Sequence, residues 1–168
     1  MEKDKKLKRA LNNAYCLLRS RPRSEAEIRM RLKLKGYGAA EIEEAVAALA
    51  RAGQIDDAKF ARLWIDSRMQ ANPMGDIVLK RELKAKGVSE PIIESALAEK
   101  AERYDEYATA LNMASERLKQ LAKLDRRKAL KRLHDFLLRR GFGFEVIQKV
   151  IGELIQNFAS LIFYHDRE

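Results

Sequence analysis

Two adjacent carboxylates, Asp56 and Asp57, have the residue types of a metal-binding pair. Carboxylate oxygens are ligands that hard divalent cations prefer. The pair stands where the sequence predicts the start of a helix, shortly after Gly53. Acidic side chains in that position complement the helix dipole and accept hydrogen bonds from free backbone N–H groups. We therefore interpret the pair as a helix cap and not as a metal site.

His134 and Asp135 form a dipeptide that also occurs in metal-dependent phosphohydrolases. Such a site needs further histidines, and the only other histidine of the chain is His165. The sequence contains no Gly-x-x-x-x-Gly-Lys-Ser/Thr, His-Glu-x-x-His or Cys-x-x-Cys motif. Its single cysteine, Cys16, is interpreted as a partly exposed, unreactive thiol. We therefore predict that the protein is not an enzyme and needs no metal or cofactor.

Basic residues recur at helical spacing and indicate a different kind of site. Arg29 and Lys33 are four residues apart, as are Lys80 and Lys84, so each pair lies on one face of its predicted helix. Both pairs stand seven and three residues before a glycine. The resulting stripe is either a contact surface for a polyanion or a solvated helix face, and both interpretations remain open at this point.

The positive charge of the chain is unevenly distributed. The formal net charge is +9, and residues 1–35 hold 12 basic and 4 acidic side chains. A basic surface raises the local concentration of polyanions, so nucleic acid or an acidic protein face is the first partner class to consider. The cations that we predict to contact such a partner are Arg29, Arg31, Lys33, Lys35, Arg68, Lys80, Arg81, Lys84, Lys86, Arg126, Arg127, Lys131, Arg132, Arg139 and Arg140.

The elements that position these cations are defined by a repeated segment, Leu-x-x-[Lys/Arg]-Gly-[Tyr/Val/Phe]-[Gly/Ser], around Gly36, Gly87 and Gly141. Apolar residues occupy matching positions at helical intervals on both sides of each glycine. A glycine between two such segments indicates two helices joined by a tight turn, with the glycine as a left-handed helix cap. Three copies of the segment predict an all-α array of stacked units.

We predict three repeats of three helices, about nine helices in all, in an elongated array. Ser24 and Glu27 form a capping box that opens a helix after the break at Pro22. Residues 69–76 are predicted to form a mobile loop, and the first helix of the third repeat is predicted at residues 102–121. The predicted boundaries of the three repeats are residues 1–54, 55–101 and 102–168.

The composition agrees with a helical protein. Of the 168 residues, 35% are charged, and the chain has only three prolines and eight glycines. No apolar run approaches the roughly 20 residues that span a bilayer, and the N-terminus lacks the hydrophobic stretch of a signal peptide, so we expect a cytoplasmic protein with no membrane contact. The apolar stretch 158–164 is expected to fold back onto the third repeat, and the alternative is a docking segment for a partner.

Four segments carry a resemblance to a known family by their order and spacing. They are Arg-Ser-Glu-Ala-Glu-Ile-Arg at 23–29, Asp-Asp-Ala-Lys-Phe-Ala at 56–61, Glu-Leu-x-x-Lys-Gly-Val at 82–88 and Phe-Leu-Leu-Arg-Arg-Gly-Phe at 136–142. Together they resemble the bacterial RecX family, over about residues 14–155. The chain departs from the family pattern at residues 104–107, where the usual Asp-Trp-type opening is absent.

The resemblance implies tandem three-helix repeats in a curved array that binds the RecA recombinase and seats in the groove of its DNA filament. It further implies inhibition of the recombinase and co-protease activities that serve homologous recombination, DNA repair and the SOS response. The alternative is a helical protein that binds single- or double-stranded DNA without RecA specificity. We expect a monomer in either case.

Overall fold

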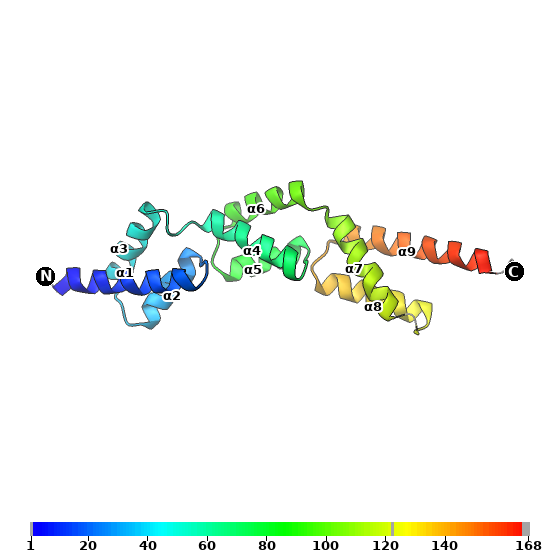
Figure 1. Ribbon diagram of the computed structural model, residues 1–168, viewed down its shortest axis with the longest axis horizontal. Helices are drawn as coiled ribbons and strands as arrows, with labels where there is room; N and C mark the ends of the chain where they lie inside the picture. The colour runs from blue at the N-terminus through cyan, green and yellow to red at the C-terminus, as the bar shows by residue number, and fades with distance from the viewer. Residues whose placement is uncertain (1, 122, 166–168) are drawn as a thin grey trace. The chain divides into compact units, whose positions relative to one another are not determined.

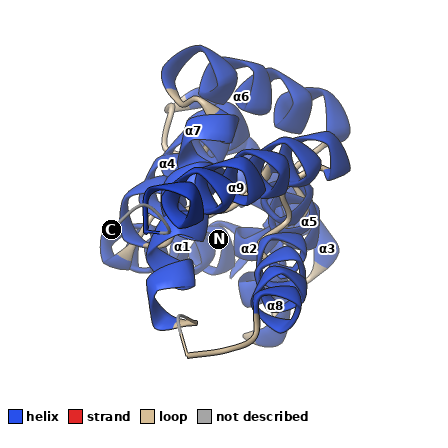
Figure 2. Cartoon of the chain, turned by 90° about the vertical axis from the view of Figure 1, so that its right-hand side faces the viewer, coloured by secondary structure: helices blue, strands red, loops and turns tan. Residues whose placement is uncertain are grey.

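The computed structural model describes residues 2–121 and 123–165, with side chains for residues 4–121 and 123–156. The described backbone forms nine α-helices and no β-strand (Figures 1 and 2). The predicted all-α class with three helices in each repeat is confirmed. The helices are α1 (Glu2–Ser20), α2 (Glu25–Leu34), α3 (Ala39–Arg51), α4 (Asp57–Ala71), α5 (Asp76–Ala85), α6 (Glu90–Arg103), α7 (Glu106–Gln120), α8 (Arg126–Arg139) and α9 (Phe144–His165).

The repeated glycine segment forms the same turn three times. Gly36, Gly87 and Gly141 have φ angles of +83°, +76° and +82°, in the left-handed region that favours glycine. In the first copy, the Gly36 N–H donates to the carbonyl of Lys33 (3.0 Å) and the Tyr37 N–H donates to the carbonyl of Leu32 (3.3 Å). This bond pair is the Schellman motif, in which the residue after glycine packs on a helix residue five positions earlier. The motif explains why leucine, glycine and an apolar residue recur together.

The chain divides into two compact units, Met1–Ser67 with Arg81–Ala98 and Arg68–Lys80 with Glu99–Glu168. The predicted boundaries at 1–54, 55–101 and 102–168 stay a prediction. In the first compact unit, α1, α2 and α3 pack on one another around a shared core. Tyr15 of α1 is 41% exposed, whereas Leu17 of the same helix packs on the core. The buried residues of this core include Ala10, Ala14, Ile28, Leu32, Ala45, Val46 and Leu49.

In the second compact unit, α7, α8 and α9 pack pairwise on one another. The alanines at 110 and 114 are fully buried and four residues apart, which gives α7 a narrow face for close helix packing. Their core partners are Leu133, Leu137, Phe142, Ile147, Val150 and Leu154. Side chains 157–168 lie outside the described residues, so the predicted packing of the apolar tail is not tested.

The middle helices α4, α5 and α6 each contribute residues to both compact units. Two predicted element boundaries were wrong here. The helix α4 continues to Ala71, so the connection to α5 is shorter than the predicted loop 69–76. The helix α6 continues to Arg103, and α7 begins only at Glu106, where the Asp105 carboxylate accepts from the Ala108 N–H (3.0 Å). Among the described helices, none has both the length and the apolar character of a membrane span.

Candidate partner-binding surface and two repeat junctions

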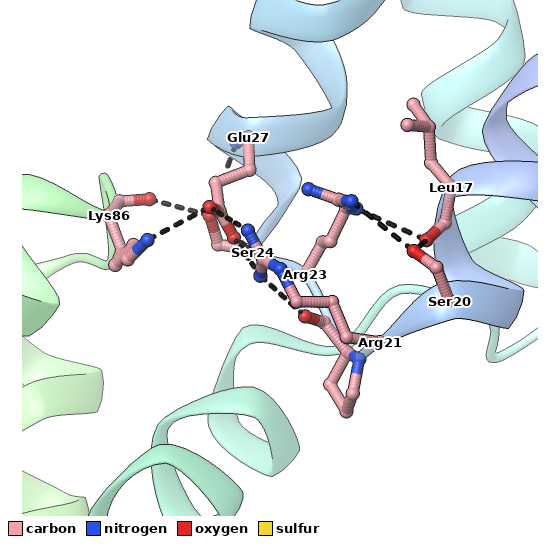
Figure 3. Close-up of polar contacts among 8 residues, drawn as sticks. Leu17, Ser20, Arg21, Arg23, Ser24, Glu27 and Lys86 are labelled. Carbon is pink, nitrogen blue, oxygen red and sulfur yellow. Dashed lines mark hydrogen bonds and ion pairs between the residues drawn. The ribbon is translucent and has the colours of Figure 1, made fainter.

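The first junction joins the start of α2 to the end of α5 within the first compact unit. We define it by Arg21, Ser24, Glu27 and Lys86 (Figure 3). The Ser24 hydroxyl is fully buried, accepts from the Glu27 N–H (3.2 Å) and donates to the carbonyl oxygen of Lys86 (2.5 Å). The predicted capping box is confirmed, because the Glu27 carboxylate also accepts from the Ser24 N–H. The same serine thus caps its own helix and holds a segment 62 residues further along the chain.

Glu27 is the charged centre of this junction. Its side chain is 16% exposed, and its Oε1 lies 2.8 Å from Nη2 of Arg21 and 3.0 Å from Nζ of Lys86. Burial alone would raise the pKa of Glu27, but the hydrogen bonds and positive charges of Arg21 and Lys86 outweigh burial and lower the pKa to about 2. The Lys86 ammonium also lies 4.9 Å from the centre of the Trp64 ring. Lys86, a predicted contact residue, is therefore held within the fold.

The remaining polar contacts at this place also have structural roles. Nε of Arg23 donates to the carbonyl of Leu17 (3.1 Å), which satisfies a free carbonyl near the end of α1 (Figure 3). The Asp56 carboxylate caps α4 by accepting from the Lys59 N–H (2.9 Å), as predicted. Asp57, however, accepts from the Glu25 N–H at the start of α2 (2.8 Å). Burial raises the pKa of Asp57, and this hydrogen bond opposes the rise. No local signal in the sequence indicated this link, because its two ends are 32 residues apart.

The second junction joins the connection between α4 and α5 to the end of α8, within the second compact unit. The Gly75 N–H donates to the carbonyl of Arg140 (2.9 Å), and the Ile77 N–H donates to the carbonyl of Gly141 (3.2 Å). The Arg140 guanidinium also donates to the amide oxygen of Asn72. Gly75 is buried, and a Cβ atom on it would lie 2.1 Å from the carbonyl oxygen of Gly141. These contacts hold the connection between α4 and α5 against the end of α8, and the predicted mobility of this loop stays a prediction.

The two junctions occupy equivalent positions of the repeat. Ser24 and Gly75 each stand twelve residues before the turn glycine of their own repeat. Each contacts the carbonyl of the residue that precedes the turn glycine of the next repeat, Lys86 or Arg140. Neighbouring repeats are therefore joined by a helix start against a glycine turn in both cases.

The four cations of the predicted stripe have different surroundings. Nε of Arg29 lies 2.8 Å from the Glu25 carboxylate, and the same guanidinium is also paired with Glu43. These hydrogen bonds raise the pKa of Arg29. Lys84 lies 2.7 Å from the Glu90 carboxylate, and Lys80 is half-buried. Of these four cations, Lys33 alone is exposed and has no carboxylate partner among the described residues. The stripe is therefore not an equivalent set of four available cations.

Other predicted contact residues are exposed and have no ion pair or side-chain hydrogen bond within the described part of the chain. We call these residues, together with Lys33, the exposed cations. Two further predicted contact residues do not belong to this group: Arg126 is exposed but donates to the carbonyl of Ile155 (3.3 Å), and Arg68 is half-buried. The exposed cations are Arg31, Lys33 and Lys35 at the end of α2, Arg81 on α5, and Arg127, Lys131, Arg132 and Arg139 on α8.

Three glycine-capped repeats of helices, which carry exposed cations on α2, α5 and α8, define an all-α tandem-repeat protein. Family comparison gives the particular family. The first, second and third three-helix domains of RecX match residues 10–49, 56–97 and 104–151 in that order. The chain belongs to the RecX family, and the resemblance noted in its sequence is confirmed.

Relatives and solved structures agree along most of the chain. The regulatory protein RecX of Prosthecochloris aestuarii is 38% identical over 154 residues, which cover 92% of this chain and 99% of that protein. The regulatory protein RecX of Amycolatopsis mediterranei is 32% identical over 94% of this chain and 89% of its own length. The crystal structure of RecX from Lactobacillus salivarius has a TM-score of 0.81 at 22% identity and covers 91% of this chain and 99% of that one. That structure supports the fold.

Proposed function

We propose that this chain is a cytoplasmic RecX-type regulator that binds RecA on its DNA filament and inhibits the recombinase and co-protease activities of RecA. Its membership of a family of regulatory proteins over all three repeats is the observation that carries the proposal. The exposed cations offer a means of binding, because they are not neutralised by carboxylates of the described chain.

A nucleoprotein filament suits such a surface. It presents phosphates and acidic protein side chains at regular intervals, and weak charge contacts over several subunits add up without a deep pocket. The cations Arg31, Lys33 and Lys35 at the end of α2 are the best candidates in the first compact unit, because all three are exposed within five consecutive residues and Arg31 and Lys35 share one helix face. We propose that these three residues contact the filament.

Pelleting of RecA filaments, with and without DNA, tests the proposal. The protein should pellet with RecA on single-stranded DNA, and it should slow RecA-driven ATP hydrolysis. A DNA-binding protein without RecA specificity would instead pellet with DNA whether or not RecA is present. Replacing Arg31, Lys33 and Lys35 by Glu should weaken pelleting at least tenfold and make the remaining binding less sensitive to salt.

A matched control separates local contact from net charge. Replacing Lys5, Lys6 and Lys8 by Glu makes the same change of two charges at each of three exposed positions, on α1. Acidic residues near the start of a helix are compatible with its dipole, so α1 should remain folded. Equal losses in the two triple variants would show that α2 has no particular role. Unimpaired inhibition by the α2 variant would move the proposed contact to α8.

A further inference from the structure

A cleft of about 430 Å³ lies between α7 and α8 in the second compact unit. Its lining combines apolar and cationic side chains, among them Met113, Arg117, Phe136 and Arg140. The guanidinium carbon of Arg117 lies 5.7 Å from the centre of the Phe136 ring, and that of Arg140 lies 5.2 Å from it. Two guanidinium groups therefore share one aromatic ring, and we call this place the α7–α8 cleft.

The lining of the cleft has a net positive charge. Its one carboxylate belongs to Glu116, which lies 2.5 Å from the ammonium of Lys119. That pair is exposed, so solvent weakens it, but Lys119 offsets the negative charge next to the cleft. The charges of Arg117 and Arg140 have no such carboxylate among the described residues. The cleft therefore favours an anionic ligand.

Both guanidinium groups keep hydrogen-bond donors available. Arg117 uses Nη1 to donate to the amide oxygen of Gln120 (2.6 Å), and Arg140 uses Nη1 to donate to Asn72. Within the described chain, Nε and Nη2 of these two arginines have no acceptor. A guanidinium presents five N–H donors in a fixed plane that matches phosphate oxygens. The two arginines are suited to bind phosphate and, at the same time, to stack on a flat ring.

The sequence of α8 extends this chemistry beyond the cleft. Lys128, Arg132, Phe136 and Arg140 follow one another at intervals of four residues, so they lie along one face of the helix. Lys128 and Arg132 are exposed and have no side-chain partner among the described residues. Alternation of cations with an aromatic ring along a surface is the pattern that binds single-stranded nucleic acid, in which bases stack on rings and phosphates meet cations.

We propose that the α7–α8 cleft binds one nucleotide of single-stranded DNA. The base stacks on the Arg117 guanidinium, which itself lies over the Phe136 ring, and the flanking phosphates are bound by Arg140 and Arg132. The proposal rests on the proposed function for the source of the strand, which is the RecA filament. A free mononucleotide presents the same base and phosphate, so the experiment must distinguish the two sources.

The test is fluorescence anisotropy of a labelled 20-residue oligothymidine with the full-length protein, in the absence of RecA. Arg117→Gln removes one charge and one stacking plane, and it breaks one side-chain hydrogen bond, to Gln120, and the contact with the Phe136 ring. We expect it to weaken binding about tenfold, in the range found when one stacked base contact is lost. Lys123→Gln removes the same charge at an exposed residue outside the cleft lining that has no side-chain partner among the described residues, and it should weaken binding less than twofold.

A second variant tests the ring itself. Phe136→Leu keeps apolar volume towards the core, on which Phe136 packs, but removes the aromatic ring over which the Arg117 and Arg140 guanidinium groups lie. It should weaken binding by a similar factor, with circular dichroism showing that the fold is kept. Unlabelled thymidine monophosphate should compete only at concentrations far above those of the strand, whereas equal competition per nucleotide would assign the cleft to free nucleotides. Equal effects of Arg117→Gln and Lys123→Gln would overturn the proposal.

This experiment and the filament assay fail independently. If the parent protein does not pellet with RecA filaments, but Arg117→Gln loses affinity for the strand, the proposed function is wrong and the α7–α8 cleft is still a strand-binding site. If the parent protein pellets with RecA filaments, but Arg117→Gln binds the strand as tightly as the parent, the proposed function stands and the proposed role of the cleft is wrong.

Discussion

At the first junction, a buried serine hydroxyl and an ion-paired glutamate connect the start of α2 to the end of α5. At the second junction, backbone N–H groups connect the start of α5 to the end of α8. Position by position, Ser24 is replaced by Gly75, Glu27 by Val78, and Lys86 by Arg140. The geometry is repeated, but the side chains that make it are not.

The difference follows from how closely the segments approach. At the second junction, an added Cβ on Gly75 would overlap backbone atoms of Gly141 and Phe142, so only glycine fits. At the first junction the segments stand far enough apart for a serine side chain to lie between them. A side-chain bridge of this kind depends on charge and pH, whereas a backbone bridge depends mainly on shape.

The largest effect is expected from Gly75→Ser, which places the residue of the first junction in the second. Its Cβ would meet the Gly141 carbonyl oxygen at 2.1 Å, and backbone atoms cannot move aside as a flexible side chain can. We expect the free energy of unfolding to fall by about 4 kcal/mol, at the upper end for single substitutions. Urea unfolding followed by circular dichroism measures the change.

Gly143→Ser is the control for this substitution. Gly143 precedes α9 in the same compact unit, and no atom lies within 4 Å of a Cβ placed on it. Serine is also favoured at the start of a helix, so stability should be unchanged or slightly higher. A loss below about 1 kcal/mol for Gly75→Ser would mean that the second junction has room for a side chain.

A smaller loss is expected from Glu27→Gln, which removes the charged centre of the first junction. The pKa of Glu27 is lowered from 4.5 to about 2, so the ionised side chain stabilises the fold at neutral pH. Because Arg21 is 40% exposed and partly screened by solvent, we expect a loss of about 2 kcal/mol at pH 7. Glu102→Gln, at an exposed residue with no recorded contact among the described residues, should change stability by less than about 0.5 kcal/mol.

The loss in Glu27→Gln should also depend on pH in one direction. A carboxylate with a lowered pKa stabilises the folded state above its unfolded pKa of about 4.5, and this contribution disappears as the pH falls towards 2. The difference in unfolding free energy between the parent and Glu27→Gln should therefore be constant above about pH 5 and shrink below it. The loss in Gly75→Ser should not change over that range. A pH-independent difference for Glu27→Gln would show that the ion pairs do not stabilise the junction.

Local signals in the sequence predicted the helices and their caps. The turn at Gly36 and the box of Ser24 with Glu27 depend on residues within one or two helical turns, and both are present as expected. The junctions were not predictable in this way, because Ser24 meets Lys86 and Gly75 meets Arg140 across long stretches of chain. Periodicity locates the face of a helix, but it does not show which neighbouring helix meets that face.

The candidate site shows the same limit. Arg29 and Lys33 have equivalent spacing in the sequence, but Glu43 of α3 pairs with Arg29, whereas Lys33 has no carboxylate partner in the described chain. The contact between Arg117 and Phe136 joins two helices and had no counterpart in the spacing of basic residues. Spacing therefore identified the cations of each helix, and tertiary packing decides which of them are available to a partner.

The smallest effect is expected from Ser24→Gly, which places the residue of the second junction in the first. Glycine is itself an acceptable helix cap, so loss of the capping bond to the Glu27 N–H should cost only a few tenths of a kcal/mol. The substitution also removes the hydrogen bond from the Ser24 hydroxyl to the Lys86 carbonyl, so the carbonyl oxygen of Lys86 would lose this donor. We expect a total loss of about 1 kcal/mol, measured by urea unfolding.

Ser89→Gly isolates the part of this loss that belongs to the junction. Ser89 precedes α6 as Ser24 precedes α2, but it is exposed, and its hydroxyl has no recorded hydrogen bond in the described chain. The two substitutions change the same atoms at the start of a helix, so the excess loss in Ser24→Gly measures the two hydrogen bonds of the Ser24 hydroxyl, the cap to the Glu27 N–H and the bond to the Lys86 carbonyl. An excess of only a few tenths of a kcal/mol would correspond to the cap alone, and Glu27 would then be the residue that makes the first junction polar. An excess loss of about 1 kcal/mol would show that the hydroxyl at the first junction replaces the backbone bond at the second.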